Sequence, residues 1–263
     1  MPDYLAPVLR QWLINLLSTQ EGLATSLQLR LRRQVFATRI HPQDRPKLAF
    51  QGNELLEAVD AILAINAHFI ETTNPALAQE REEWPDHVGV LGFRLTEAGS
   101  AWKINDDLDG LERRVDETAA AAARSTIAAA PPDASAHLKA AWSTAYGFHP
   151  DPEKAYSQAI KAAEAVVIPA TIPNAGTPTL GTALKHLEDT KAKWTTVLDD
   201  KNGNPASAEP IIGLIRMLWQ GQRDRHAGGP TSKPTTQEAA EAAVHAAVLI
   251  VQWFNSRAVV KNP

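Results

Sequence analysis

The 263-residue sequence predicts a mainly α-helical protein with two domains. Alanine is abundant, aromatic residues make up only 6%, and runs of valine, isoleucine or threonine are few, so helix is favoured over strand. Apolar residues also recur at the spacing of amphipathic helices. Pro131 and Pro132 follow an alanine-rich stretch, and proline cannot continue a helix. We therefore expect a mostly helical N-terminal domain over residues 1–130 and a bundle of about four helices over residues 131–263.

Two amphipathic helices are expected early in the N-terminal domain. Apolar residues are spaced for one helical face between Leu5 and Leu17, and again between Leu55 and Phe69. Residues 27–47 lie between these helices and are basic. Leucine alternates with polar residues at the start of this segment, so strand and helix remain competing alternatives there. Its arginines either contact RNA or a partner or form a solvated face, and a run of charge favours the solvated face.

The second half of the N-terminal domain is predicted to change from irregular chain to strand and then to helix. Residues 78–99 are acidic and contain Pro85 and three glycines, which favours an interrupted segment. Residues 100–104 are typical of a short strand, so one short strand pair is the β structure expected. Residues 111–130 then have the composition of a helix.

The C-terminal domain has clear helix signals. Residues 151–153, Asp-Pro-Glu, supply an N-cap, a first-turn proline and a first-turn acid. Thr235 and Glu238 have the spacing of a capping box and mark another helix start. Trp194 and Leu198 are spaced so that an earlier helix can continue through them. After the helix that starts at Asp151, helices are expected over residues 180–202, 207–226 and 236–257.

Composition excludes several classes of protein. No window approaches the roughly 18 apolar residues of a membrane span, and residues 1–4 lack the layout of a signal peptide. A cytoplasmic protein without a membrane partner is therefore expected. The sequence contains no cysteine, which excludes disulfides, thiolate metal sites and cysteine nucleophiles.

The balance of charge argues against binding nucleic acid by phosphate neutralisation alone. Residues 1–130 carry 13 Lys and Arg against 18 Asp and Glu, and residues 131–263 carry 13 against 12. Neither half has the strong excess of basic residues that such binding needs. Any contact with RNA or DNA is therefore expected to be local.

The candidate site is the polar stretch that precedes the last predicted helix. Residues 223–226 read Arg-Asp-Arg-His and are followed by Ala-Gly-Gly-Pro. On a helix that continues to His226, Arg216, Gln220 and Arg223 share one face, while Ile212, Ile215, Leu218 and Trp219 face the core. The sequence thus predicts a cationic stripe with an imidazole at its end.

This group of side chains suits phosphodiester cleavage without a metal. The 2′-hydroxyl of RNA is the nucleophile, and it needs a base, an acid for the leaving oxygen and cations for the phosphorane. We assign catalysis to Arg223 and His226, since imidazole titrates near neutral pH and the guanidinium fork matches phosphate oxygens. Substrate binding is assigned to Arg216, Gln220, Asp224 and Arg225.

A structural alternative accounts for the same residues. Arg223, Arg225 and His226 are ordinary partners for the carbonyls and dipole at a helix C-terminus, with Gly228 or Gly229 as the left-handed cap. Asp224 would then be a salt-bridge partner that orients or neutralises the arginines. The sequence leaves both interpretations open.

Three stretches carry a resemblance to a known family. They are Asp-Pro at 151–152 with Ala-Ile-Lys-Ala-Ala-Glu at 159–164, Arg-Asp-Arg-His at 223–226, and Glu-Ala-Ala-Glu-Ala-Ala-Val at 238–244. Over about residues 137–257 the chain resembles the HEPN superfamily, in particular its abortive-infection C-terminal branch. The resemblance implies a helical bundle that dimerises. It also implies a metal-independent ribonuclease that uses an Arg, a following polar residue and a later His.

The chain departs from the family's pattern at the histidine. The resemblance places that His about five to seven positions after the Arg, where this chain has Gly228, Gly229 and Pro230. His226 lies only three positions after Arg223. Either His226 substitutes through a different local turn, or the domain keeps the fold without the nuclease chemistry.

Two functions from different classes therefore follow. The first is a HEPN-like, metal-independent endoribonuclease of a prokaryotic defence or toxin-like system, such as abortive infection against phage. It would need no cofactor and would act as a homodimer formed through the C-terminal bundle. The alternative is a non-catalytic helical module that binds RNA, a nucleotide or a protein, or that serves as a scaffold.

Other motifs are weaker. Asn105, Asp107, Asp109, Gly110 and Asp116 have the spacing of an EF-hand loop, but Glu112 occupies its usual apolar position, so an acidic turn is favoured over a calcium site. Seven further histidines show no paired metal spacing, and His245 is expected to pack within its helix. No metal is therefore predicted.

Overall fold

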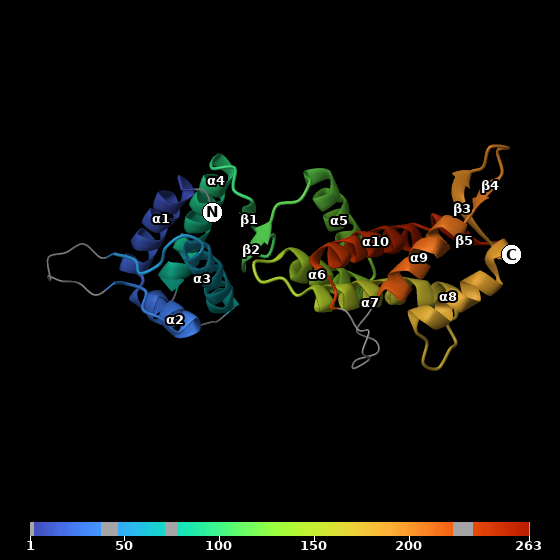
Figure 1. The fold of residues 1–263 in the computed structure, drawn as a ribbon, viewed down its shortest axis with the longest axis horizontal. Coiled ribbons are helices and arrows are strands. Elements are labelled where there is room, and N and C mark those ends of the chain that lie inside the picture. The colour runs from blue at the N-terminus through green and yellow to red at the C-terminus, as the bar shows by residue number, and fades with distance from the viewer. Residues whose placement is uncertain (1–2, 38–46, 72–77, 223–233, 263) are drawn as a thin grey trace. The chain divides into compact units, whose positions relative to one another are not determined.

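The computed structural model describes residues 3–37, 47–71, 78–222 and 234–262. The chain divides into two compact units, residues 1–114 and 115–263. As predicted, helices dominate the described residues, and small antiparallel sheets complete them (Figure 1). None of the described helices combines the length and apolar character needed to cross a bilayer.

The first unit is built on an apolar helix whose face is buried by its neighbours. Its elements are α1 (Leu5–Thr19), α2 (Glu21–Leu31), α3 (Glu54–Glu71), α4 (Ala78–Glu97), β1 (Trp102–Ile104) and β2 (Leu111–Arg113). In α1, Leu5, Leu9, Leu13 and Leu16 are fully buried at helical spacing. This face packs on α2, α3 and α4. The two predicted amphipathic helices are therefore confirmed as α1 and α3.

Helix α4 replaces the interrupted segment that the sequence predicted. Trp84, Val88, Leu91 and Leu95 are buried and follow each other at three- and four-residue spacing. This apolar stripe gives the segment enough packing to remain helical, although Pro85 lies inside it. Tertiary burial therefore outweighs the local cost of proline.

Residues 27–47, the basic segment for which the sequence leaves strand and helix as alternatives, begin in α2, which ends at Leu31. Arg33 then donates to Glu54 Oε1 at 2.9 Å and lies over the Phe50 ring, 5.3 Å from its centroid. Hydrogen bonds from Arg33 and from the Gln51 N–H hold the pKa of Glu54 below its ordinary value. Arg33 therefore has a structural role within the first unit.

Strands β1 and β2 form the predicted short pair, with Ile104 opposite Leu111. Their turn contains the acidic stretch, where Asn105 Nδ2 donates to Asp109 Oδ1 at 2.6 Å. Asp60 Oδ1 accepts from the Leu111 N–H at 2.7 Å and fastens the hairpin to α3. Among the described residues, no cluster of three or more histidine or carboxylate side chains is arranged to hold a metal ion.

Helix α5 (Glu117–Ala129) belongs to the second unit. The helix predicted over 111–130 begins only at Glu117, because residues 111–113 pair with β1 as strand β2. Asp116 is its N-cap and accepts hydrogen bonds from the Thr118 and Ala119 N–H groups. Ala120 and Ala123 are buried in the core of the second unit. The chain thus divides before α5, whereas the sequence placed the division after it.

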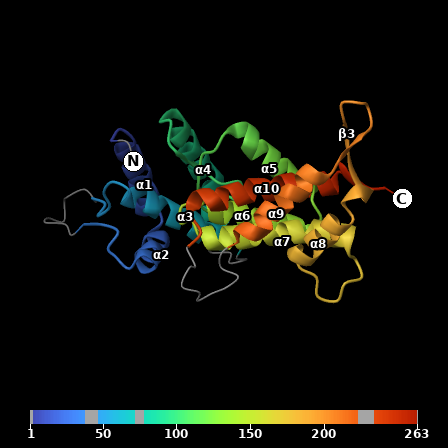
Figure 2. The same ribbon diagram turned by 45° about the vertical axis from the view of Figure 1, so that its right-hand side comes forward.

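The second unit contains a bundle of four helices in which α6 and α9 run opposite to α7 and α10 (Figures 1 and 2). Its helices are α6 (Pro132–Tyr146), α7 (Pro152–Thr171), α9 (Glu209–Gly221) and α10 (Gln237–Asn255), and α8 (Leu180–Asp189) packs on α7 and α9. The Gln237 side chain at the start of α10 donates a hydrogen bond to the Ala145 carbonyl near the end of α6. The Asn255 side chain at the end of α10 donates one to the Ala129 carbonyl just before α6. Helices α6 and α10 therefore run in opposite directions.

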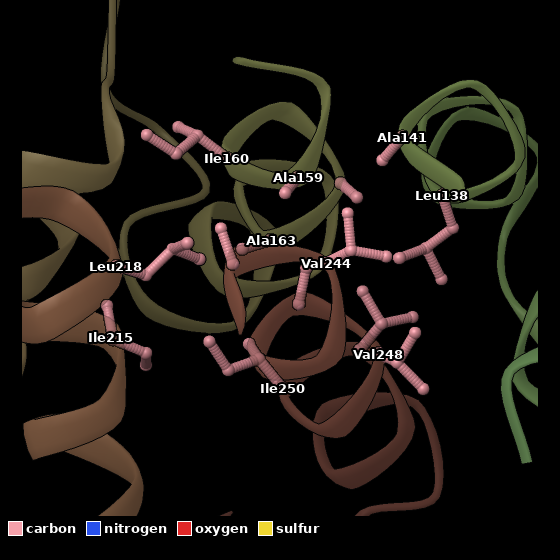
Figure 3. Close-up of a cluster of buried hydrophobic side chains, with 14 of the residues drawn as sticks. Leu138, Ala141, Ala159, Ile160, Ala163, Ile215, Leu218, Val244, Val248 and Ile250 are labelled. Carbon is pink, nitrogen blue, oxygen red and sulfur yellow. The ribbon is translucent and has the colours of Figure 1, made fainter. Parts of the chain in front are cut away.

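The core of the bundle is rich in alanine where α7 meets α10. Ala159, Ala163 and Ala247 are fully buried, and side chains this small let two helices approach closely. Figure 3 shows larger side chains from α6, α9 and α10 filling the space around this contact, among them Leu138, Leu218 and Val244. Burying each such side chain stabilises the fold by about 1.5–3 kcal/mol.

A three-stranded antiparallel sheet lies beyond the C-terminal end of α10 and was not predicted. It has the order β4 (Pro205–Ser207), β3 (Trp194–Asp199), β5 (Val259–Lys261), and a 3₁₀ turn at Lys191–Lys193 precedes β3. The expected continuation of α8 through Trp194 and Leu198 is therefore wrong. Thr195 and Thr196 are β-branched, and they pair with Val260 and Val259 at the far end of the chain.

The hairpin between β3 and β4 is closed by Asp200. The backbone N–H groups of Asn204 and Asn202 donate to Asp200 Oδ1 at 3.0 and 2.8 Å. These bonds hold the pKa of Asp200 below its ordinary value, because they favour the ionised carboxylate.

Candidate functional site

The candidate site lies at one end of the bundle, which we call the connection end: residues 145–156, 218–222 and 234–237. Here the Tyr156 hydroxyl, in the second turn of α7, donates to the Leu218 carbonyl near the end of α9 at 3.0 Å. Gln237 Nε2, at the start of α10, donates to the Ala145 carbonyl at 2.6 Å. These two bonds bring the α6–α7 connection together with both ends of the α9–α10 connection.

Helix α9 presents the apolar face that the sequence predicted. Ile212, Ile215 and Leu218 are buried, and Trp219 packs partly buried against the same core. On the polar side, Gln220 is exposed and Arg216 is half-buried. Arg216 Nε donates to Glu188 Oε1 of α8 at 2.6 Å, so this guanidinium already has a carboxylate partner.

The predicted continuous helix to His226 is wrong, because α9 ends at Gly221 and Gln222 has an extended backbone. A Cβ added at Gly221 would overlap the Tyr156 hydroxyl oxygen, so glycine is required for this close contact with α7. The stripe therefore reaches only Arg216 and Gln220 on α9. Four candidate residues, Arg223, Asp224, Arg225 and His226, lie outside the described residues.

Helix α10 begins one residue later than the predicted cap implies. Thr236, not Thr235, is the N-cap, and its hydroxyl accepts from the Ala239 N–H at 3.2 Å. Gln237 Nε2 also donates to Glu241 Oε1 at 2.9 Å. Gln237 Oε1 is buried without a hydrogen-bond partner among the described residues. The start of α10 is therefore fixed to α6 by side-chain contacts as well as by apolar packing.

A tyrosine–histidine pair adjoins this end of α10 and was not found from the sequence. The hydroxyl of Tyr146, which is 1% exposed, lies 2.9 Å from Nε2 of His245. Trp142 packs on both rings, 4.6 Å from the Tyr146 centroid and 5.8 Å from the His245 centroid. His245 is exposed rather than packed within its helix, and it presents its imidazole on the surface between α6 and α10.

Substituting Tyr146→Phe is expected to lower the free energy of unfolding by about 1 kcal/mol. The change removes a hydroxyl from a buried position and leaves the His245 nitrogen to water. Urea unfolding monitored by circular dichroism measures the loss. Ser143→Ala, at an exposed position of the same helix, is the control and should change stability less; an equal loss in both variants would show that the pair contributes nothing of its own.

A second aromatic pair, Phe148 with His149, lies in the connection between α6 and α7. Their ring centroids are 5.0 Å apart and the ring planes meet at 82°, an edge-to-face arrangement. Phe148 is half-buried and His149 is exposed. The signal available in the sequence is an aromatic dipeptide in a short turn before a strong N-cap, but only the fold shows that this turn lies at the same end of the bundle as Leu218 and Gln237.

The described charges at the connection end are mostly negative. Asp151 accepts from the Lys154 N–H at 3.0 Å as the N-cap of α7, as predicted. Glu153 and Glu238 are exposed near the starts of α7 and α10, and Lys154 is the exposed cation beside them in the described part of this region. The segment between α9 and α10, which lies outside the described residues, contains Arg223, Arg225 and Lys233.

Comparisons with known proteins found no relative. No family model matches the chain, and neither a curated protein nor a solved structure matches it. The fold and site therefore define a class only in structural terms: an up-and-down helical bundle with a polar connection at one end and a small sheet at the other. Function is inferred from the chain's own residues and their geometry.

Proposed function

We propose that the protein acts on RNA at the connection end, as a HEPN-like, metal-independent endoribonuclease of a prokaryotic defence or toxin-like system. One observation carries the proposal. The α9–α10 connection, which contains Arg223, Asp224, Arg225 and His226, leaves and re-enters the bundle beside the α6–α7 connection. The two ends of the segment that carries these cations and this imidazole are thereby held on packed helices, and a rigid support of this kind favours a substrate site.

The chemistry needs only side chains that this chain contains. His226 would exchange a proton with the 2′-hydroxyl or the leaving oxygen, and Arg223 would neutralise the charge that develops on the phosphorane. Arg225 and Gln220 would hold adjacent phosphate oxygens or sugar hydroxyls. Arg216 is bonded to Glu188, so its role in this scheme is to orient the end of α9.

The experiment that tests the proposal is cleavage of labelled RNA by the purified full-length protein in EDTA. Single-stranded and structured RNAs are compared, and the products are examined for 2′,3′-cyclic phosphate ends. Such ends are expected, because attack by the adjacent 2′-hydroxyl leaves them. Intact RNA after prolonged incubation at high protein concentration would contradict the nuclease proposal.

A homodimer through the C-terminal bundle forms part of this proposal. It is supported by the resemblance to HEPN proteins, in which two clusters would face a shared cleft. Sedimentation equilibrium of the full-length chain gives the oligomeric state directly. A monomer at the concentrations used for cleavage would contradict the dimer without affecting the assignment of Arg223 and His226.

A non-catalytic binding module is the second candidate, and two observations favour it. Arg216, one of the predicted phosphate ligands, forms a salt bridge with Glu188. Two glycines and a proline occupy the positions where HEPN proteins have their histidine. In this case the connection end would bind RNA, a nucleotide or a protein without turnover.

Arg223→Ala is expected to weaken RNA binding about tenfold at low salt, because one charge-assisted contact with a phosphate is lost. The same variant should release about one counterion fewer on binding, which makes the slope of log affinity against log salt concentration shallower. Fluorescence anisotropy over a salt series measures both quantities. Arg257→Ala, at an exposed position near the sheet, is the control and should bind like the wild-type protein.

A further inference from the structure

We propose that Phe148 and His149 form a subsite that stacks an unpaired nucleobase of the RNA. This inference rests on the proposed function, because it names the part of the substrate that the α6–α7 connection recognises. It assigns single-stranded RNA, read through its bases, as the ligand of this connection. The three observations that support it are the ring geometry, the position of the pair and the charge around it.

The turn holds the two rings in a fixed arrangement. The Gly147 N–H donates to the Ser143 carbonyl and the Asp151 N–H donates to the Thr144 carbonyl, both at 2.9 Å, so the connection is closed on each side of the aromatic pair. The pair is edge-to-face, with the centroids 5.0 Å apart. A base that stacks on such a pre-ordered ring loses little conformational entropy from the protein side.

The pair lies at the end of the bundle where α9 ends and α10 begins. Phe148 is three residues after Ala145, whose carbonyl binds Gln237 at the start of α10. It is also eight residues before Tyr156, whose hydroxyl binds Leu218 near the end of α9. The aromatic turn thus lies at the same end of the bundle as both ends of the connection that carries Arg223 and His226. A nucleotide neighbouring the scissile phosphate is the group that would reach it.

The charge around the pair favours a base over a phosphate. Asp151, Glu153 and Glu238 are exposed in this part of the molecule, and Lys154 is the exposed cation beside them among its described residues. A phosphate would be repelled by this excess of carboxylates, whereas the face of a neutral base would not. Bases in a duplex have no face available for stacking, so the subsite selects single-stranded RNA.

The test compares the binding of two single-stranded ligands of equal length: an RNA and a ribose-phosphate backbone without bases. The full-length protein is measured by fluorescence anisotropy as wild type, Phe148→Leu, His149→Asn and Phe93→Leu. Phe93 is the control, because it is 59% exposed on a helix of the first unit. Circular dichroism melting shows whether each variant is folded. If Phe148→Leu does not fold, His149→Asn still tests the subsite, because His149 is exposed.

Loss of one base stack is expected to raise the Kd for RNA by about 5- to 100-fold in Phe148→Leu, with a smaller increase in His149→Asn. Binding of the abasic backbone, and the salt dependence of binding, should stay as in the wild type, because no phosphate contact is lost. Phe93→Leu should bind both ligands normally.

Two results would overturn the inference, and they are distinguishable. Equal affinity of the wild type for RNA and for the abasic backbone would remove the base subsite and leave the proposed action on RNA intact. Absence of binding to either ligand at low salt would remove the proposed function together with the subsite.

Discussion

Replacing His226 by alanine is expected to abolish cleavage of RNA in EDTA while leaving the fold intact. In the proposed mechanism, His226 is the residue of the 223–226 cluster that transfers a proton. General acid–base catalysis increases the rate of a reaction by about 10²- to 10⁴-fold, so its loss should lower the cleavage rate by that factor. The measurement is the rate at which 2′,3′-cyclic phosphate ends form from a labelled single-stranded RNA. RNA binding should persist, since Arg223 and Arg225 remain.

His68→Ala is the matched control for this experiment. His68 is an exposed histidine on α3 in the first unit, so its loss removes an imidazole without touching the bundle. The control should cleave at the wild-type rate. Undiminished cleavage by His226→Ala would exclude His226 as the proton-transfer group, and loss of cleavage in both variants would point to a general effect on the protein.

Gly181→Ala is expected to lower the free energy of unfolding by about 1–3 kcal/mol, the cost of overpacking. Gly181 lies in the first turn of α8, and an added Cβ would come 2.5 Å from Cε2 and Cζ2 of Trp219. The indole ring of Trp219 is rigid and partly buried against the core, so it cannot make room without moving α9. Urea unfolding measures the change.

Gly213→Ala, on the neighbouring helix α9, is expected to raise the free energy of unfolding. Gly213 lies inside α9, and nothing lies within 4 Å of the position that its Cβ would occupy. Alanine should therefore stabilise the protein by about 0.5–1 kcal/mol through its higher helix propensity. Destabilisation by both substitutions would mean that the contact with Trp219 is not the cause.

Most of the helices follow from local patterns that the sequence contains. The spacing of leucines in α1 and the Asp-Pro start of α7 are signals within a few residues of each other, and both were confirmed. Helix α4 and strand β3 could not be predicted in this way. The stripe through Trp84 and Leu95 outweighs Pro85 only because packing against α1 and β1 buries it. Strand β3 forms because it pairs with β5, which lies at the far end of the sequence.

The candidate site was predicted in composition but not in geometry. The sequence predicts a phosphate-binding cluster at residues 223–226, and helical spacing assigns Arg216 to the same stripe. The sequence does not show that Arg216 is bonded to Glu188, which is 28 residues away on another helix. Nor does it show that Tyr146 meets His245, 99 residues later. Such contacts depend on how α6, α8, α9 and α10 pack, and no local pattern encodes that packing.

The assignment of α5 to the second unit determines where this protein can be divided. A chain cut at residue 131 would lose Ala120 and Ala123 from its core and would leave apolar surface on the bundle open to water. It would also leave Asn255 without the Ala129 carbonyl that it binds at the end of α10. A fragment that starts at Val115 keeps these contacts, together with the Asp116 cap of α5. The smallest intact piece carrying the connection end is therefore set by a helix that takes no part in the site itself.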